Sequence, residues 1–435
     1  MLSVERRAEL SCELAKQFED KGEYEEARRA LGRFWQRVGE SPKVAGLEPG
    51  TAAEVLLRVG VLTGAIGNQN QVAETEETAK NLISESLTLF ESQRYKKKIA
   101  EAQVELALCY WRTGELNEAR DLLKEALSHL TTESEVKAKA IVRLAIVERG
   151  AGNYEKALRI LTKSAPLFQK INNQTLKGSY HVTLGIVLRN LWESKKRTEF
   201  IDRALIEYAA ASYHFEQAEH RCYLANVENN LGFLYYKIKR HEEAHAHLDH
   251  ARRVLVGLKD TSTVAQVDET RACVFLEQGR TAEAERIARS AVRSLEKTDR
   301  QALLAEALVT HGRALARLGN YSIALSTFRR AVTLAEQAGN RNRAADAALA
   351  VFEEIGDHLA VAEGRSTISS GKLSEEVQAL EHELIERSLD ATEGSITYAA
   401  RRLGIPHQTL NYMLETRHRD LLQKRTPGRR RARKR

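Results

Sequence analysis

The chain has 435 residues, carries 67 Lys and Arg against 60 Asp and Glu, and contains only five prolines. Ala, Leu, Glu and Arg, which are strong helix formers, are abundant, so the composition predicts an all-α protein large enough for several domains. We expect neither a signal peptide nor a membrane span, because the first ten residues are charged and no uncharged apolar run reaches about 18 residues.

A short pattern recurs along the first three quarters of the chain: Gly, any residue, an aromatic or large residue, two further residues and Ala. It occurs as GEYEEA (22–27), GELNEA (114–119), GNYEKA (152–157), GNYSIA (319–324) and, more loosely, GRTAEA (279–284). Twelve residues before most of the alanines stands a small residue, at Ala107, Ala145, Gly232, Ala272 and Gly312. The pattern predicts helical hairpins, in which the small residue and the alanine let two helices approach and the glycine ends the first helix.

This pattern resembles the tetratricopeptide repeat, and NNLGFLYY (229–236) is a good copy of its first helix. The resemblance covers roughly residues 5–338, and its spacing of 38 to 40 is that of the long-repeat version in bacterial signal-responsive regulators. It implies a superhelix of about eight hairpins with a terminal capping helix over residues 1–363, because each hairpin leaves a face that only the next can cover. Residues 52–90 match poorly, and seven extra residues near 190–200 indicate an extended helix or a loop.

In the repeat register, the first helices of the hairpins present polar and aromatic side chains to the inner surface of the superhelix. Arginine and asparagine can hold a peptide backbone or a carboxylate there. A merely solvated inner surface is the alternative interpretation. The candidate residues for binding a protein or peptide partner are Trp111, Arg143, Arg149, Arg189, Asn226, Asn230 and Tyr236.

The stretch HEEAH (241–245) matches the H-E-x-x-H zinc-protease signature, which places two histidines and a glutamate on one helix face. However, KRHEEAH (239–245) aligns on GEYEEAR (22–28), so the repeat pattern accounts for the E-E-A core of the match. Leu248 and Ala251 occupy the positions of the glycine and third histidine of the extended motif. We therefore expect no catalytic residues, no metal site and no cofactor.

A second module is expected after a Ser/Gly linker at residues 364–373, where the glycines of GRSTISSGKLS are too far apart for a phosphate loop. Ser374 is a good N-cap. The helix that follows has apolar residues at spacings of three and four, namely Val377, Leu380, Leu384, Ile385 and Leu389. Short helices at 396–403 and 407–415, joined by GIP, predict a helix-turn-helix.

The string LEHELIERSLDATEGSITYAARRLGIPHQTLNYML (380–414) resembles the Fis-type DNA-binding domain. The resemblance implies a domain at 374–416 that binds double-stranded DNA. Helix-turn-helix modules commonly act as dimers, and the stripe of Val377, Leu380 and Leu384 is apolar enough to pair. We therefore expect a homodimer formed at least partly by residues 374–392. Gln and Asn can pair bidentately with adenine. The side chains that would enter the major groove are His407, Gln408, Thr409, Asn411 and Tyr412.

The end of the chain is strongly basic. Residues 415–435 hold ten basic against two acidic residues, a charge of +8, so the rest of the chain carries −1 of the net +7. The family usually has Arg or Lys near residues 411–413, and a basic tail at 417–435 can replace them as phosphate contacts. A solvated tail without a target is the alternative. The tail residues expected to contact DNA are Arg417, Arg419, Lys424, Arg425, Arg429, Arg430 and Arg431.

Together these patterns predict a cytoplasmic transcriptional regulator rather than an enzyme. Four cysteines without a C-x-x-C pair fit reduced thiols in the cytoplasm. The repeats would bind a protein, peptide or other ligand, and the helix-turn-helix would read DNA. The alternative is a non-enzymatic interaction scaffold whose basic tail binds RNA or acidic partners.

Overall fold

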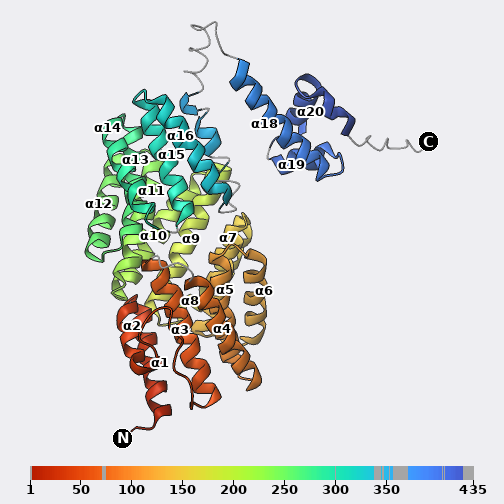
Figure 1. The fold of residues 1–435 in the computed structure, drawn as a ribbon. Coiled ribbons are helices and arrows are strands. Elements are labelled where there is room, and N and C mark those ends of the chain that lie inside the picture. The colour runs from red at the N-terminus through yellow and green to blue at the C-terminus, as the bar shows by residue number, and fades with distance from the viewer. Residues whose placement is uncertain are drawn as a thin grey trace, which may run out of the picture. The chain divides into compact units, whose positions relative to one another are not determined.

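The computed structural model describes residues 2–70, 75–298, 300–337, 344, 347–351, 353–355, 371–403, 405 and 407–424, with the backbone alone at 68–70 and 371–380. All regular structure in these residues is helical (Figure 1). The chain divides into two compact units, Met1–Glu354 and Ile355–Arg435. Each unit is described by itself.

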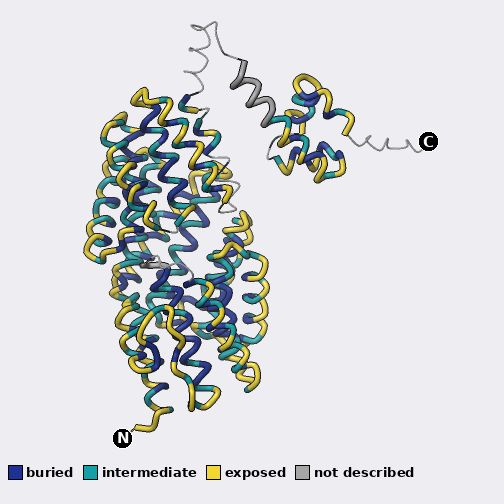
Figure 2. The backbone as a smooth tube through the Cα atoms, in the orientation of Figure 1, coloured by how far each residue is buried: buried dark blue, intermediate teal, exposed yellow. Residues whose placement is uncertain are grey.

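Unit 1 consists of eight helical hairpins in its described residues, which confirms the predicted architecture. Figure 2 shows buried residues along the helix faces that meet neighbouring helices, and exposed ones at the turns. The hairpins are α1 (Val4–Lys21) with α2 (Tyr24–Leu31), which continues as η1 (Gly32–Phe34), α3 (Pro49–Asn70) with α4 (Thr75–Ser92), α5 (Lys96–Arg112) with α6 (Leu116–His129), α7 (Glu135–Gly150) with α8 (Tyr154–Lys170), α9 (Gln174–Lys195) with α10 (Glu199–Gln217), α11 (Arg221–Lys237) with α12 (His241–Gly257), α13 (Thr261–Glu277) with α14 (Thr281–Leu295), and α15 (Gln301–Arg317) with α16 (Tyr321–Gln337).

Two uncertain regions of the repeat pattern are settled by the structure. The poorly matched second repeat is the tightly packed hairpin α3–α4. The seven extra residues of the fifth repeat lengthen α9 to Lys195, so they form an extended helix rather than a loop. The capping helix expected to close the repeats is described only in part, and its residues Ala347 and Ala350 are fully buried. Its remainder and residues 364–370 of the expected linker lie outside the described residues.

The helices of a hairpin meet where the first carries a residue with a small side chain. A Cβ added at Gly185 would lie 2.7 Å from the Tyr208 ring, and one added at Gly232 would lie 2.5 Å from Leu248. The turn glycines also have the predicted left-handed backbone, with φ of 75° at Gly22. Lys239, which replaces the turn glycine in the sixth repeat, adopts the same conformation with φ of 63°.

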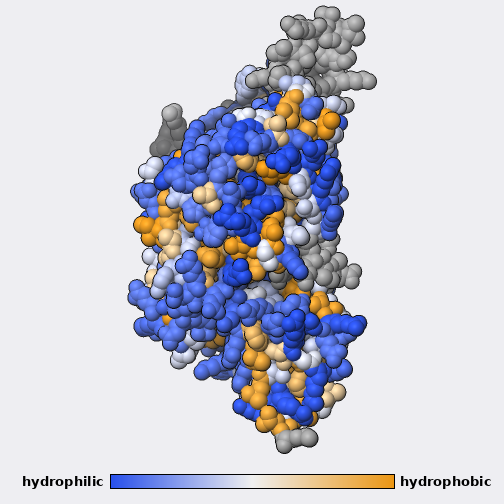
Figure 3. Space-filling view, turned by 90° about the vertical axis from the view of Figure 1, so that its left-hand side faces the viewer, coloured by the Kyte–Doolittle hydropathy of each residue, from blue (hydrophilic) through white to orange (hydrophobic). Residues whose placement is uncertain are grey.

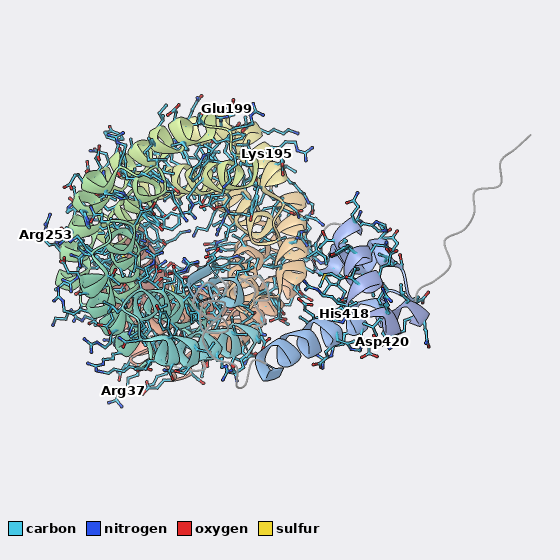
Figure 4. The ribbon with its side chains drawn as sticks, turned by 90° about the horizontal axis from the view of Figure 1, so that it is seen from above. Arg37, Lys195, Glu199, Arg253, His418 and Asp420 are labelled. Carbon is cyan, nitrogen blue, oxygen red and sulfur yellow. The ribbon has the colours of Figure 1, made fainter. Side chains whose placement is uncertain are left out.

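The superhelix completes a turn, and its first hairpin contacts the turn between α10 and α11. Thr175 Oγ1 donates a hydrogen bond to the carbonyl oxygen of Asp20 at 2.6 Å. A Cβ added at Gly22 would lie 2.4 Å from Cε1 of His220, a side chain that is 1% exposed. Burial lowers the pKa of His220 to about 4, so this ring is neutral at pH 7. Figure 4 shows the resulting ring of helices around a central opening.

A buried ion cluster joins three of the helices in this first turn. Arg58 in α3 is 1% exposed, and its guanidinium lies 2.8 Å from Glu19 Oε2 in α1 and 3.1 Å from Glu101 Oε1 in α5. Burial by itself would raise the pKa of Glu101, but the charges of Arg58, Lys16 and Lys98 outweigh it and hold the pKa at about 2. Burial dominates at Glu19 and raises its pKa.

Helix α3 is also the most apolar helix of unit 1. Its window Pro49–Gly67 has the length and mean hydropathy, 1.3, of a membrane span, but 72% of it is buried inside the protein. Val55, Leu57 and Leu62 are fully buried, so the window forms core packing. The face drawn in Figure 3 is mostly hydrophilic, with apolar residues in patches between the polar ones.

Unit 2 contains α18 (Gly371–Asp390), α19 (Ile396–Leu403), α20 (His407–Thr416) and η2 (Arg419–Lys424). Helix α18 begins three residues before the N-cap expected at Ser374, because Lys372 and Leu373 are good helix formers. The core residues of unit 2 are Ile385, Leu389, Ile396, Ala399, Ala400, Leu410, Leu414 and Leu421. Because Leu421 belongs to this core, the packing of unit 2 includes a residue beyond the boundary expected at 416.

The contact at Gly22 should be sensitive to a single methyl group. Gly22→Ala adds a Cβ that clashes with His220, whereas Gly152→Ala adds one with nothing within 4 Å at nearly the same φ, 77°. Both variants should lose about 1–2 kcal/mol from the left-handed backbone. Gly22→Ala should lose about 1–3 kcal/mol more from overpacking. Urea unfolding of both variants measures the difference, and equal losses would contradict the described contact.

Removing the charge of Arg58 should be far more costly than removing a surface charge. Arg58→Met removes the ion pair of the buried Glu19 and leaves Glu101 with only Lys16 and Lys98, so it should lower the free energy of unfolding by about 3–5 kcal/mol at pH 7. The matched control is Arg29→Met, because Arg29 is 65% exposed and its pair with Glu26 contributes about 0–1 kcal/mol.

The effect of Arg58→Met should also depend on pH. The folded-state pKa of Glu101 lies below its ordinary value of 4.5, so its ion pairs contribute stability above 4.5 and lose it as the pH falls toward about 2. The difference between wild type and Arg58→Met should therefore shrink over that range in urea unfolding. A difference that stays constant from pH 7 to pH 3 would contradict this assignment.

Candidate functional site

Helix α20 of unit 2 exposes the polar face that the sequence predicts. Leu410 and Leu414 are fully buried, and these two residues fix which side of the helix faces solvent. The exposed side chains at its start are His407, Gln408 and Thr409, followed one turn later by Tyr412, which is 64% exposed. Asn411 Nδ2 donates to Glu415 Oε1 at 2.7 Å, while its Oδ1 has no partner in the described residues.

The basic residues that follow α20 are partly neutralised within the domain. Lys424 Nζ lies 2.8 Å from Glu386 Oε1 and 2.9 Å from Asp390 Oδ2, both on α18. Lys424, which is among the residues expected to contact DNA, thus links η2 to α18 in this structure. Arg419 Nε donates to the carbonyl oxygen of Glu415 at 2.8 Å.

Two further contacts explain why this segment folds back. His418, labelled in Figure 4, is 2% exposed, and its Nε2 lies 3.3 Å from Glu381 Oε2 on α18. The exposed Arg417 lies 3.6 Å from the same carboxylate. The expected contacts Arg425, Arg429, Arg430 and Arg431 lie outside the described residues.

The structure adds two cations that the sequence reading of the helix-turn-helix did not single out. Arg401 and Arg402 at the end of α19 are exposed, and neither forms an ion pair in the described residues. Arg401 lies over the ring of Tyr398, 5.8 Å from its centroid. Arg401 and Arg402 could have been found in the sequence from the helical period, because the two residues that follow the buried Ala399 and Ala400 turn toward solvent.

The inner helices of unit 1 form a cavity of about 380 Å³ where the first turn of the superhelix closes. Its wall comes mainly from α1, α3, α5, α7, α9 and α11, with Tyr24 of α2 and Ile83 of α4, and it includes two of the predicted residues, Trp111 and Arg143. Arg143 is already engaged, because its guanidinium donates to the carbonyl oxygen of Val104 and lies 2.7 Å from Glu105 Oε2. Burial alone would raise the pKa of Glu105, but Arg143 and Lys139 outweigh it and lower that pKa.

The other predicted partner-binding residues of unit 1 are partly buried and do not line this cavity. Arg149 and Arg189 form no ion pair in the described residues. Asn226 and Asn230 lie on α11, and so does Tyr236, whose pKa is raised by burial. Two of the seven predicted residues, Trp111 and Arg143, therefore line the cavity. The other five lie outside it on α7, α9 and α11.

The two histidines of the H-E-x-x-H match, His241 and His245, and the neighbouring His247 do not converge on a common partner. His245 Nε2 lies 3.0 Å from Gln278 Oε1, and His247 Nδ1 lies 2.8 Å from Glu228 Oε2. His241 Nδ1 has no hydrogen-bond partner. No group of three or more His, Cys, Asp or Glu residues is arranged to hold a metal ion in the part of the chain that the structure describes.

Comparisons with known proteins agree with both units. Models of the tetratricopeptide repeat match residues 223–297, 100–128 and 305–337. The model described as bacterial regulatory protein, Fis family, matches residues 376–415. None of the curated proteins matches the chain.

Two solved structures show the same fold for the repeats. A Rap protein complexed with Competence and Sporulation Factor has a TM-score of 0.56 at 15% identity, over 87% of this chain and 100% of that chain. A monomeric mutant of IFIT1 with Gppp-AAAA has a TM-score of 0.51 at 15% identity, over 80% of this chain and 71% of that chain. The chain therefore combines tetratricopeptide repeats in its first unit with a regulatory domain of the Fis family in its second.

Proposed function

We propose that the chain is a cytoplasmic DNA-binding transcriptional regulator. Its Fis-family unit reads double-stranded DNA, and its repeats bind a protein, peptide or other ligand. The observation that carries the proposal is α20, a short helix with a buried apolar side and an exposed face of His407, Gln408, Thr409 and Tyr412. In a helix-turn-helix, this second helix enters the major groove.

The exposed groups of unit 2 divide into base-reading and phosphate-binding candidates. Gln408 and Asn411 carry amides, which pair bidentately with adenine. Arg401 and Arg402 belong to α19, the first helix of the motif, which crosses the DNA backbone in such domains. Arg417 and the arginines beyond residue 424 are the remaining candidates for phosphate contacts.

Ligand binding by the repeats is supported by the chemistry of the inner helices. The cavity of about 380 Å³ is lined by aromatic and charged side chains, including Tyr223 of α11. Asn226 and Asn230 follow Tyr223 on the same helix. The Rap protein of similar fold is complexed with Competence and Sporulation Factor. A ligand that alters how the repeats present unit 2 would make the chain a sensor.

The alternative is a scaffold without sequence preference, whose basic tail binds RNA or acidic proteins. The two proposals differ in their response to changes in α20. A regulator loses preference for its site when the exposed amides are removed, whereas a scaffold has no such preference to lose.

Base reading and phosphate binding should respond differently to mutation. Gln408→Ala/Asn411→Ala should cost roughly 1–3 kcal/mol per lost base-edge pair on the preferred duplex, with an almost unchanged salt slope. Arg401→Ala/Arg402→Ala should weaken binding to every duplex and lower the log–log salt slope by roughly 0.9 per lost phosphate contact. Salt titrations on specific and scrambled duplexes separate the two effects.

Removal of the tail is the matched test for phosphate binding. Truncation after Lys424 deletes Arg425–Arg435 and spares the ion pairs of Lys424 with α18. It should act as Arg401→Ala/Arg402→Ala does. If Gln408→Ala/Asn411→Ala loses nothing on the duplex that wild type prefers, the regulator proposal fails and the scaffold gains.

We also propose that unit 2 forms a homodimer through α18. Ile385 and Leu389 belong to the core of the unit, whereas Leu384 on the same helix is 47% exposed. The side chains of Val377 and Leu380, which completed the predicted stripe, lie outside the described residues.

A charge at Leu384 should therefore separate the subunits. Leu384→Glu should be a monomer in light scattering at micromolar concentration, because an unpaired carboxylate is costly to bury in an apolar interface. Arg387→Glu is the control, since Arg387 lies on the same helix with 74% exposure and should leave the dimer intact. A wild-type monomer, with and without DNA, would contradict the dimer.

A further inference from the structure

Two arginines on the inner helices of unit 1 differ from their neighbours in lacking a counter-charge. The guanidinium groups of Arg143, Arg271 and Arg317 lie within 3.0 Å of a carboxylate oxygen. Arg149 on α7 and Arg189 on α9 form no ion pair or hydrogen bond through their side chains in the described residues, and Nε of each is buried without a partner. Leaving such groups unmatched is costly unless a ligand completes them.

The two arginines occupy the same place in consecutive repeats. Arg149 follows the small residue Ala145 by four positions, and Arg189 follows Gly185 by four. Trp111, which lines the cavity, has this place in the preceding repeat. The row therefore continues the cavity wall along the inner helices.

A buried phenol completes the set. Tyr208 on α10 is 0% exposed, packs beneath Gly185, and has a hydroxyl group without a hydrogen-bond partner. The Tyr208 ring packs against Gly185, one helical turn before Arg189 on α9. Burial raises the pKa of Tyr208, while the charges of Arg189 and Arg149 lower it. Burial and the like charge of Arg189 also lower the pKa of Arg149.

The surroundings add positive charge and aromatic faces. Arg189 lies over the ring of Phe233, 4.8 Å from its centroid, and Lys237 lies 5.1 Å from the same centroid. The carboxylate of Glu193 contributes to the raised pKa of Tyr208, but it forms no ion pair with Arg149 or Arg189. The cluster thus offers donors and positive charge, with little to balance them.

We propose that Arg149, Arg189 and Tyr208 form an anion site on the inner helices of the repeats, which takes the phosphate group of a small phosphorylated ligand. This inference rests on the proposed function only in assuming that the inner surface binds a ligand. A phosphate monoester carries a charge of about −1.5 to −2 at pH 7 and three acceptor oxygens, which match two guanidinium groups and a phenol. A dicarboxylate such as succinate carries a similar charge, but its acceptor oxygens are divided between two groups instead of surrounding one phosphorus atom.

The test is calorimetric titration of the full-length protein with sodium pyrophosphate, with succinate as the carboxylate probe. Wild type should bind pyrophosphate more tightly than succinate. Arg149→Gln/Arg189→Gln should weaken pyrophosphate binding roughly 10-fold to 100-fold, as expected for hydrogen bonds to charged groups. Tyr208→Phe should weaken it less and leave the thermal midpoint of the free protein unchanged or raised, because the hydroxyl group has no partner to lose.

A matched control removes two outward-facing arginines. Arg37 and Arg253 point away from the central opening in Figure 4, and Arg37 is 82% exposed. Arg37→Gln/Arg253→Gln removes the same charge and should bind pyrophosphate within about twofold of wild type, since screened surface charges act weakly. This control separates the site from a general effect of losing two positive charges.

Three results would overturn the site. The inner variant binds pyrophosphate as tightly as wild type, the outer variant loses as much affinity as the inner one, or succinate binds as tightly as pyrophosphate through the same arginines. DNA binding of the same samples is measured separately. If wild type binds DNA with a sequence preference but does not bind pyrophosphate, the anion site is refuted and the regulator proposal stands. If wild type binds pyrophosphate but shows no preference for any DNA sequence, the regulator proposal is refuted and the anion site stands.

Discussion

The close approach of two helices at a small residue is the constraint on which the repeat unit depends. Gly185 and Gly232 leave no room for a Cβ, because Tyr208 and Leu248 from the partner helix fill that space. This contact sets the separation of the helices in each hairpin and the rotation of the first helix about its axis. The rotation in turn decides which residues, four positions later, lie along the inner row: Trp111, Arg149, Arg189 and Tyr236.

Closure of the first turn adds a second constraint, which acts between hairpins far apart in sequence. The first hairpin reaches the α10–α11 turn through Gly22 and His220, and the cavity of about 380 Å³ lies where this closure brings α1 near α9 and α11. The buried charges of Arg58, Glu19 and Glu101 belong to the same region. The cations that line the cavity are each paired with a carboxylate, whereas Arg149 and Arg189 form no ion pair in the described residues.

In unit 2, too, the packing of the helices decides which side chains face solvent. Its short helices bury alanine and leucine on one side, and the remaining side faces solvent by default. Segment 417–424 is held to α18 by His418, Leu421 and Lys424, and Lys424 forms ion pairs with Glu386 and Asp390 there. Arg401 and Arg402 are exposed and form no ion pair in the described residues.

The sequence by itself determined the helical class, the hairpins and the helix-turn-helix. These features follow from local spacing, such as the twelve residues between Gly232 and Ala244, and from apolar periods along single helices. Only the tertiary structure decided which charges are paired. The partners Arg58–Glu101, Arg143–Glu105 and Lys424–Glu386 are 34 or more residues apart, and a charged side chain looks the same in sequence whether or not a counter-charge faces it. The contact of Gly22 with His220 exists only once the superhelix has closed, and Arg149 and Arg189 are buried without a counter-charge only once the repeats have packed.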